Sequence, residues 1–226
     1  MARMLAMVSV VLACLAVVAG CGPAAPEPSF RPPGSKIAGD AAAAGEVNRS
    51  SLERRPVNEQ ANRTVPTARQ LARFRRLSRG QRIASHVTGR FIGTTDDIIE
   101  WGARKWGLDP DFLRAQAAAE SGWIQHKVGD NGRSFGILQI KRTIWRGSYP
   151  LSARSTAFNV DLAGAILRQA YDGRATWFRR DGYGSGDIWG SLGAYYSGRW
   201  NDAGGRAYVS RVRRHHAERS WTRYGL

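Results

Sequence analysis

Cysteine is nearly absent from this chain of 226 residues, in which only Cys14 and Cys21 occur. So few cysteines exclude a fold held together by several disulfides. Tryptophan and tyrosine are missing from the first 100 residues, whereas seven of the nine prolines precede residue 67. The apolar fraction of 42% can support a buried core. We therefore expect the folded part to be the C-terminal half.

Only one long apolar run without charge is present, LAMVSVVLACLAVVAG at residues 5–20. It is short for a membrane span of about 20 residues, and its basic start and small final residues are typical of a secretory signal. The run ends in Val18-Ala19-Gly20-Cys21, which resembles the bacterial lipobox. There a signal peptidase cuts before the cysteine, which is then acylated. The alternative is a signal peptide followed by an incidental cysteine.

The lipobox resemblance implies a location and an anchor. We predict a lipoprotein signal peptide over residues 1–20 and lipid attachment at Cys21, in the extracytoplasmic cell envelope of a bacterium. Two or three acyl chains, at about 0.8 kcal/mol per buried CH2, would hold the protein stably on a membrane. Cys14 would leave with the signal, so neither a disulfide nor a cysteine metal site could form. Residues 21–67 lack apolar periodicity and are predicted to be a disordered linker.

Acidic residues are missing from residues 68–90, which contain seven arginines. Leu71, Phe74 and Leu77 are spaced to face one side of a helix, so we predict an Arg-rich helical segment over residues 68–92. It either contacts anionic phospholipid or anionic wall polymer, or packs on the domain through its three apolar residues. The net charge of +16 favours a polyanionic partner. We expect no nucleic-acid partner, because no motif for one occurs.

Residues 93–226 are predicted to be mainly α-helical. The first helix has Thr95 as its N-cap and ends at Gly107. The next begins at Asp109-Pro110 and places Leu113, Ala117 and Glu120 on one face. Burial of Glu120 among core residues would raise its pKa, as a general acid near neutral pH requires. The alternative is a glutamate that ends the helix and points to water.

A stretch rich in Gly, Asp and Asn follows Glu120 and predicts tight turns. It leads into an apolar β-type run, Ile137, Leu138 and Ile140, which Gln139 interrupts. The Gln139 amide needs a hydrogen-bond partner. A sugar acetamido group or hydroxyl would serve, and so would a partner in the core.

Glu120-Ser121 followed by Gly136-Ile137-Leu138-Gln139-Ile140 resembles the "ES … G-x-M-Q" signature of the soluble lytic transglycosylase family, in the lysozyme-like superfamily. Three further pieces follow in the family's order. These are Asn159-Val160 with Gly164, Ala194-Tyr195 with Gly198, and Tyr208-Val209 with Val212. The resemblance covers roughly residues 95–215 and implies a lysozyme-like fold, mainly α with a short β and turn-rich segment.

The resemblance also implies a reaction. Family members cleave the β-1,4 bond between N-acetylmuramic acid and N-acetylglucosamine in peptidoglycan with one glutamate, here Glu120, and form a 1,6-anhydro sugar. Ordinary glycosidases need two carboxylates. Tyr195 matches a family tyrosine beside the catalytic glutamate, and Tyr196 stands where the family has asparagine. We predict substrate contacts by Ser134, Gln139, Tyr195 and Tyr196, without cofactor or metal, in a monomer.

Two alternatives remain. The stretch GDNGRSFGILQIK is also similar to goose-type lysozymes, which would make the protein a muramidase that uses Glu120 with Asp130. Those enzymes carry a second aspartate where this chain has Lys141. The other alternative is a non-catalytic lipoprotein that binds the wall.

Overall fold

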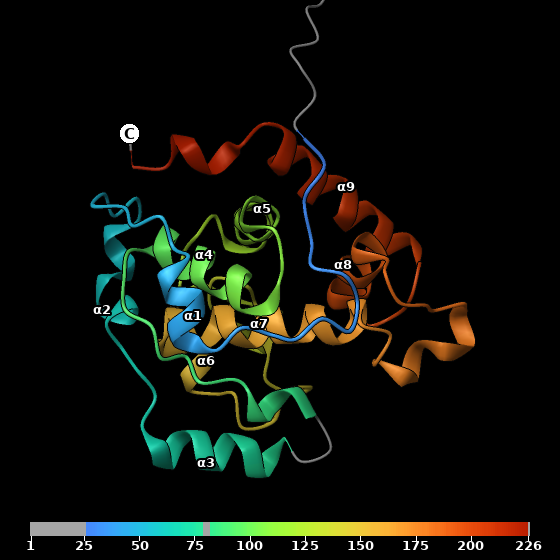
Figure 1. Ribbon diagram of the computed structural model, residues 1–226, viewed down its shortest axis with the longest axis horizontal. Helices are drawn as coiled ribbons and strands as arrows, with labels where there is room; N and C mark the ends of the chain where they lie inside the picture. Colours follow the sequence, from blue (N-terminus) through green and yellow to red (C-terminus); the bar gives the residue numbers. More distant parts are fainter. Residues whose placement is uncertain (1–25, 79–81, 226) are drawn as a thin grey trace, which may run out of the picture.

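The computed structural model describes residues 26–78 and 82–225, without the side chains of residues 82 and 179–181. The predicted signal peptide and Cys21 lie outside the described residues. Within the described ranges, no helix is both long and apolar enough to span a bilayer. The fold is mainly α-helical, as predicted (Figure 1).

The α-helices are α1 Asp40–Gly45, α2 Glu59–Asn62, α3 Ala68–Leu77, α4 Thr95–Trp106, α5 Pro110–Ser121, α6 Leu151–Arg154, α7 Thr156–Tyr171, α8 Ile188–Ser197 and α9 Ala203–Ala217. In the described part of the chain, 3-10 segments cover Pro56–Asn58, Arg82–Ser85, Thr176–Asp181 and Ser220–Arg223.

The helix α7 runs through the middle of the molecule (Figure 1), and every residue of it except Ile166 is buried. α4 packs along α7, α5 packs against α4 and α9, and α8 contacts both α7 and α9. Glycine lets α4 and α7 approach closely, because a Cβ at Gly102 would lie 2.4 Å from Cγ1 of Val160.

The two helices predicted around Gly107 form with the expected ends, except for one cap. Thr94, not Thr95, caps α4. Its side chain accepts from the Asp97 N–H, and the Asp97 carboxylate accepts from the Thr94 N–H. Thr95 is the first residue of α4, and it is buried. Gly107 ends α4 with a φ of 64°, and Asp109 caps α5 as predicted.

Residues 26–67 are not a disordered linker, and this prediction is wrong. Phe30 packs edge-on against Phe112 of α5, with ring centroids 5.2 Å apart. The guanidinium of Arg168 in α7 donates to the Pro32 carbonyl at 2.6 Å. Backbone and polar groups make many of these contacts, and such contacts leave no hydrophobic periodicity in the sequence.

A buried group of charges attaches α1 to the domain. Lys105 Nζ lies 2.7 Å from Asp40 of α1 and 2.8 Å from Asp161 of α7. The indole N–H of Trp106 donates to Asp161 at 2.7 Å. Lys105 and Asp161 are buried, so removal of one partner would leave an uncompensated charge.

Residues 50–62 enclose the start of α4 through buried amides. Asn58 donates to the Trp123 carbonyl at 2.7 Å. Asn62 donates to Glu53 at 2.7 Å, and the same carboxylate accepts from the Thr95 N–H at 2.7 Å. The N-terminal segment therefore belongs to the fold.

The Arg-rich segment forms α3, a shorter helix than residues 68–92. Thr67 caps it. Leu71 and Phe74 are buried as predicted, and the Phe74 ring meets Phe158 of α7 edge-on at 5.1 Å. Leu77, in the last turn of α3, is 43% exposed and so is only partly covered. It still faces the domain, because a Cβ at Gly147 would lie 3.0 Å from the Leu77 Cβ.

Three two-residue strands form a small antiparallel sheet in the order β1 Val128–Gly129, β2 Ser134–Phe135 and β3 Ile140–Lys141. The short β segment was predicted, but Ile137 and Leu138 lie in a turn and not in a strand. The backbone reverses there because Gly136 and Gln139 have φ values of +86° and +48°.

Candidate active site

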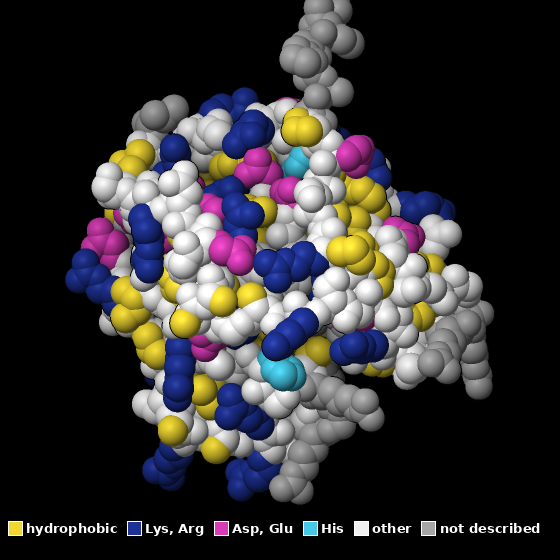
Figure 2. All heavy atoms as spheres, in the orientation of Figure 1, with side chains coloured by type: hydrophobic (Ala, Val, Ile, Leu, Met, Phe, Trp, Pro, Cys, Tyr) yellow, Lys and Arg dark blue, Asp and Glu magenta, His cyan; other side chains and the backbone are white. Residues whose placement is uncertain are grey.

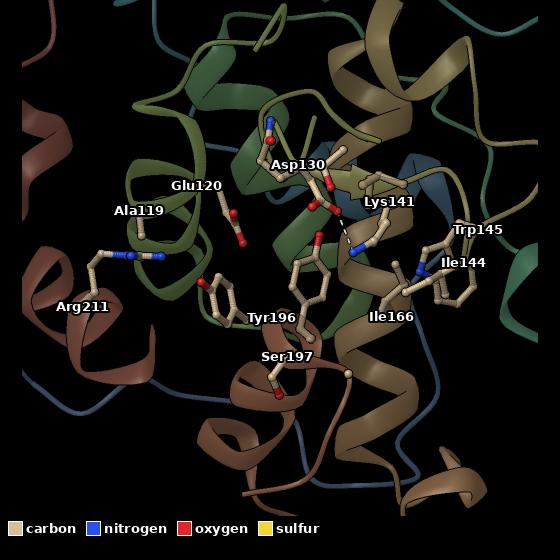
Figure 3. Close-up of a pocket in the computed structure, with 15 residues that line it drawn as sticks. Ala119, Glu120, Asp130, Lys141, Ile144, Trp145, Ile166, Tyr196, Ser197 and Arg211 are labelled. Carbon is tan, nitrogen blue, oxygen red and sulfur yellow. Dashed lines mark ion pairs between the residues drawn. The ribbon is translucent and has the colours of Figure 1, made fainter. Parts of the chain in front are cut away.

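A cleft of about 620 Å³ opens where α5 ends (Figure 3). Its walls come from α5, the small sheet with its following loop, α7, α8 and α9. All the residues predicted for catalysis and substrate binding lie in it. The polar and aromatic residues of the lining are Glu120, Asp130, Ser134, Gln139, Lys141, Trp145, Tyr195, Tyr196, Ser197 and Arg211.

Glu120 stands in the last turn of α5, with Leu113 and Ala117 of the same face fully buried. Burial raises the pKa of Glu120 from 4.5 to about 7, although a hydrogen bond from Tyr208 and the charge of Arg211 lower it. The predicted raised pKa is confirmed, and the water-facing alternative is wrong. Near neutral pH this carboxyl can donate a proton and later accept one.

Tyr208 of α9 holds the Glu120 carboxyl, whereas Tyr195, the tyrosine expected beside this glutamate, lies near it without this bond. The Tyr208 hydroxyl donates to Glu120 Oε1 at 2.6 Å. Tyr195 instead donates to the Leu138 carbonyl, in the turn before β3. Burial and the nearby Glu120 charge raise the pKa of both tyrosines, so they stay protonated donors. The Tyr208-Val209 motif was visible in the sequence, but the contact joins residues 88 positions apart.

Tyr196 and Arg211 form the opposite end of the cleft from Lys141 (Figure 3). The Tyr196 ring is exposed and stacks on Tyr208, with centroids 4.5 Å apart and planes 9° apart. The Arg211 guanidinium lies 5.1 Å from the centre of the Tyr208 ring. Arg211 carried no motif signal, so the sequence did not single it out.

Motif residues hold the turn that carries Gln139. Asn159 of α7 donates to the Phe135 carbonyl at 2.8 Å and accepts from the Leu138 N–H at 2.9 Å. Ser121, next to the candidate acid, donates to the Ile137 carbonyl at 2.8 Å. The "ES" pair and the distant asparagine therefore fix one loop relative to Glu120.

Gly136 has a structural role in this turn. A Cβ there would lie 2.1 Å from Asn159 Nδ2 and 2.4 Å from the Ser152 carbonyl. Gln139 donates through Nε2 to the carbonyls of Gly136 at 2.8 Å and Lys127 at 3.2 Å. The alternative of a hydrogen-bond partner within the protein therefore holds for the Gln139 amide nitrogen. Among the described residues none donates to its Oε1, which lies so close to Gly129 that a Cβ there would be 2.2 Å away.

Asp130 reaches the same cleft but is neutralised. Its Oδ2 lies 2.6 Å from Lys141 Nζ (Figure 3). Its Oδ1 lies 3.4 Å from the Arg133 guanidinium. The hydrogen bond from Lys141 is the largest cause of a pKa below the usual range of an aspartate. Ser134 is buried in β2, directly opposite Lys141 of β3. The two acidic side chains thus differ, since Glu120 is protonated more readily and Asp130 stays ionised.

Within the described parts of the chain, no three His, Cys, Asp or Glu side chains gather as a metal site requires. Neither a scan against protein-family models nor a search of curated proteins matches this chain.

Proposed function

We propose that the protein is a peptidoglycan lytic transglycosylase of lysozyme-like fold, with Glu120 as its single catalytic acid and base. The observation that carries this proposal is the state of Glu120. It lines an open cleft, and burial sets its pKa at about 7. The order of the motifs along the chain supports the same conclusion.

In the proposed reaction Glu120 first donates its proton to the glycosidic oxygen that leaves N-acetylmuramic acid. The same carboxylate then takes the proton of the C6 hydroxyl, whose oxygen bonds to C1 and closes the 1,6-anhydro ring. The proton returns to Glu120, so no water is consumed. The hydrogen bond from Tyr208 and the charge of Arg211 stabilise the carboxylate form between these two steps.

Substrate contacts are proposed for the residues that line the cleft around Glu120. The Tyr196 ring offers a partly exposed aromatic face to a sugar, while Gln139 Oε1 and the Ser134 side chain offer polar atoms. Tyr195 acts indirectly, because its hydroxyl holds the backbone of Leu138. No cofactor is proposed.

A muramidase that uses Asp130 as its second carboxylate is the next candidate. An inverting or retaining hydrolase needs a free carboxylate as base or nucleophile. Here each oxygen of Asp130 lies in an ion pair, and Lys141 supplies the closer cation. The non-catalytic alternative needs an exposed, unperturbed Glu120, which is not what the cleft contains.

Turnover of isolated peptidoglycan by the wild type, Glu120→Gln and Asp130→Asn tests the proposal. We expect Glu120→Gln to lose activity by about a thousandfold or more and Asp130→Asn to stay within about tenfold of the wild type. Loss of activity in both variants would favour the muramidase, and full activity in Glu120→Gln would exclude both mechanisms.

Together with this activity we propose that the protein is attached to a membrane through Cys21 and acts in the cell envelope.

A further inference from the structure

Two stretches of the chain contain no acidic residue at all. Residues 60–95 carry eight arginines, and residues 131–160 carry four arginines and Lys141. The whole protein has 18 acidic residues, so stretches of 36 and 30 residues without one are regions of concentrated positive charge.

The two stretches pack against each other. The Ser78 hydroxyl at the end of α3 donates to the Arg146 carbonyl at 3.1 Å. Gly147 lies so close to α3 that a Cβ on it would be 3.0 Å from Leu77. Their charges therefore belong to one surface at the α3 end of the molecule, where Figure 2 shows several Lys and Arg side chains.

Five arginines of this surface are exposed. Leu71 and Phe74 bury one face of α3, three of the arginines stand elsewhere on this helix, and the other two lie in the loop after β3. Among the described residues, no acidic side chain forms an ion pair with any of the five. We call them the basic surface: Arg69, Arg73, Arg76, Arg142 and Arg146.

The basic surface is continuous with the candidate active site. Lys141, Ile144 and Trp145 line the cleft on the side away from Arg211 (Figure 3). The same loop continues to Arg146 and the end of α3. Apolar side chains lie exposed along this path, with Ile144 55% and Tyr149 44% accessible. Exposed rings and aliphatic groups between cations suit a sugar chain that carries carboxylates.

We propose that the basic surface binds the glycan strand beyond the cleft, through the carboxylates of its peptide stems. This inference rests on the proposed function and names the part of the substrate that lies outside the catalytic cleft. Each exposed contact is weak and screened by salt, so binding depends on several arginines together.

Sedimentation of the full chain in detergent with isolated peptidoglycan tests the inference. The Glu120→Gln background keeps the polymer intact. Arg69→Gln, Arg73→Gln and Arg76→Gln are combined in one variant. A control combines Arg174→Gln, Arg206→Gln and Arg214→Gln, which removes the same charge from other exposed positions.

We expect the α3 variant to bind at least about tenfold more weakly at low salt and the control to bind within about threefold of the parent. The difference should disappear near 1 M salt, where the Debye length is about 3 Å. Equal binding of the two variants at low salt would overturn the proposal.

Three preparations distinguish the chemical group that the basic surface binds: wall without phosphate polymers, wall without peptide stems, and anionic phospholipid vesicles. We expect binding to persist after removal of phosphate polymers from the wall and to fall when an amidase removes the peptide stems. Two results would overturn the assignment to stems. One is binding that is lost when the phosphate polymers are removed, and the other is binding to anionic phospholipid vesicles in place of peptidoglycan.

Activity assays distinguish failure of this inference from failure of the proposed function. With Glu120 intact, the α3 variant should cleave short soluble fragments at the parental rate and intact peptidoglycan at least about fivefold more slowly. An equal rate on both substrates would overturn the inference and leave the proposed function standing. If the parent cleaves neither substrate, the proposed function fails and this inference, which rests on it, fails as well.

Discussion

The hydroxyl of Tyr208 donates a hydrogen bond to Oε1 of Glu120 across 2.6 Å, from α9 to the end of α5. This bond favours the carboxylate, because an ionised acceptor makes the stronger hydrogen bond. It opposes the effect of burial, which raises the pKa of Glu120 to about 7. The balance between burial and this bond sets the pH at which Glu120 can act.

Replacement of Tyr208 by Phe removes the bond and leaves the ring. We expect the pKa of Glu120 to rise above about 7, and the loss of activity on the alkaline side to move to higher pH. The maximal rate should fall, because the carboxylate formed after the first proton transfer loses a donor. The measurement is the pH profile of peptidoglycan turnover.

Tyr196→Phe is the matched control, since Tyr196 stacks on Tyr208 and makes no hydrogen bond to Glu120 among the described contacts. Its alkaline limb should stay in place. An unchanged alkaline limb in Tyr208→Phe would show that the bond does not set the pKa.

Glu120 makes stability depend on pH. Its pKa in the folded state lies above the ordinary 4.5, so the folded state holds the proton more tightly. The resulting stability is fully present below about pH 4.5 and is lost as pH rises through about 7. At about 1.4 kcal/mol for each pKa unit, the loss reaches up to about 3 kcal/mol.

Glu120→Gln should therefore be more stable than the wild type at pH 8 by up to about 3 kcal/mol, and close to it at pH 4.5. Urea denaturation at both pH values measures the difference. Glu59→Gln, at an exposed glutamate, is the control. A wild type that matches Glu120→Gln in stability at pH 8 would contradict the raised pKa.

The turn before β3 should not tolerate a side chain at Gly136. Gly136→Ala combines a φ of +86° with a clash against Asn159, so we expect a loss of about 3 kcal/mol or more in the free energy of unfolding. Gly132→Ala is the control, since Gly132 has a φ of +78° but nothing within 4 Å of a Cβ. It should cost only about 1–2 kcal/mol. Equal losses in denaturant titrations would mean that Asn159 does not confine this turn.

The N-terminal segment should contribute to stability. Asn58→Ala leaves the Trp123 carbonyl and the Gln125 N–H without their buried partner, which costs about 2–5 kcal/mol in total. The exposed Asn48 offers a control, and Asn48→Ala should stay within about 0.5 kcal/mol of the wild type. If Asn58→Ala is as stable as this control, residues 50–62 do not hold the start of α4.

Local signals in the sequence predicted the local features of the fold. Gly107 and Asp109 mark helix ends by their own backbone and capping chemistry, and the face shared by Leu113 and Glu120 follows from helical spacing. The same signals predicted that Glu120 lies on the core-facing side of α5 and that its pKa is raised. The cap of α4 was misplaced by one residue because two threonines stand side by side, and either can cap a helix.

Contacts between distant residues were not predictable in this way. Asn58 and Asp40 attach the N-terminal segment through polar groups, so it had the composition of a linker. The motifs indicated Tyr195 as a neighbour of Glu120 but did not indicate the bond from Tyr208, because only the packing of α9 on α5 brings Tyr208 to the carboxyl.

In the proposed mechanism Glu120 alone carries out cleavage, without water. Mass spectrometry of the fragments that the wild type and Glu120→Gln release from peptidoglycan tests this. We expect 1,6-anhydro-muramoyl ends, one water lighter than hydrolysis products, from the wild type and none from Glu120→Gln. Reducing ends from the wild type would rule out this mechanism, and so would anhydro ends released by Glu120→Gln.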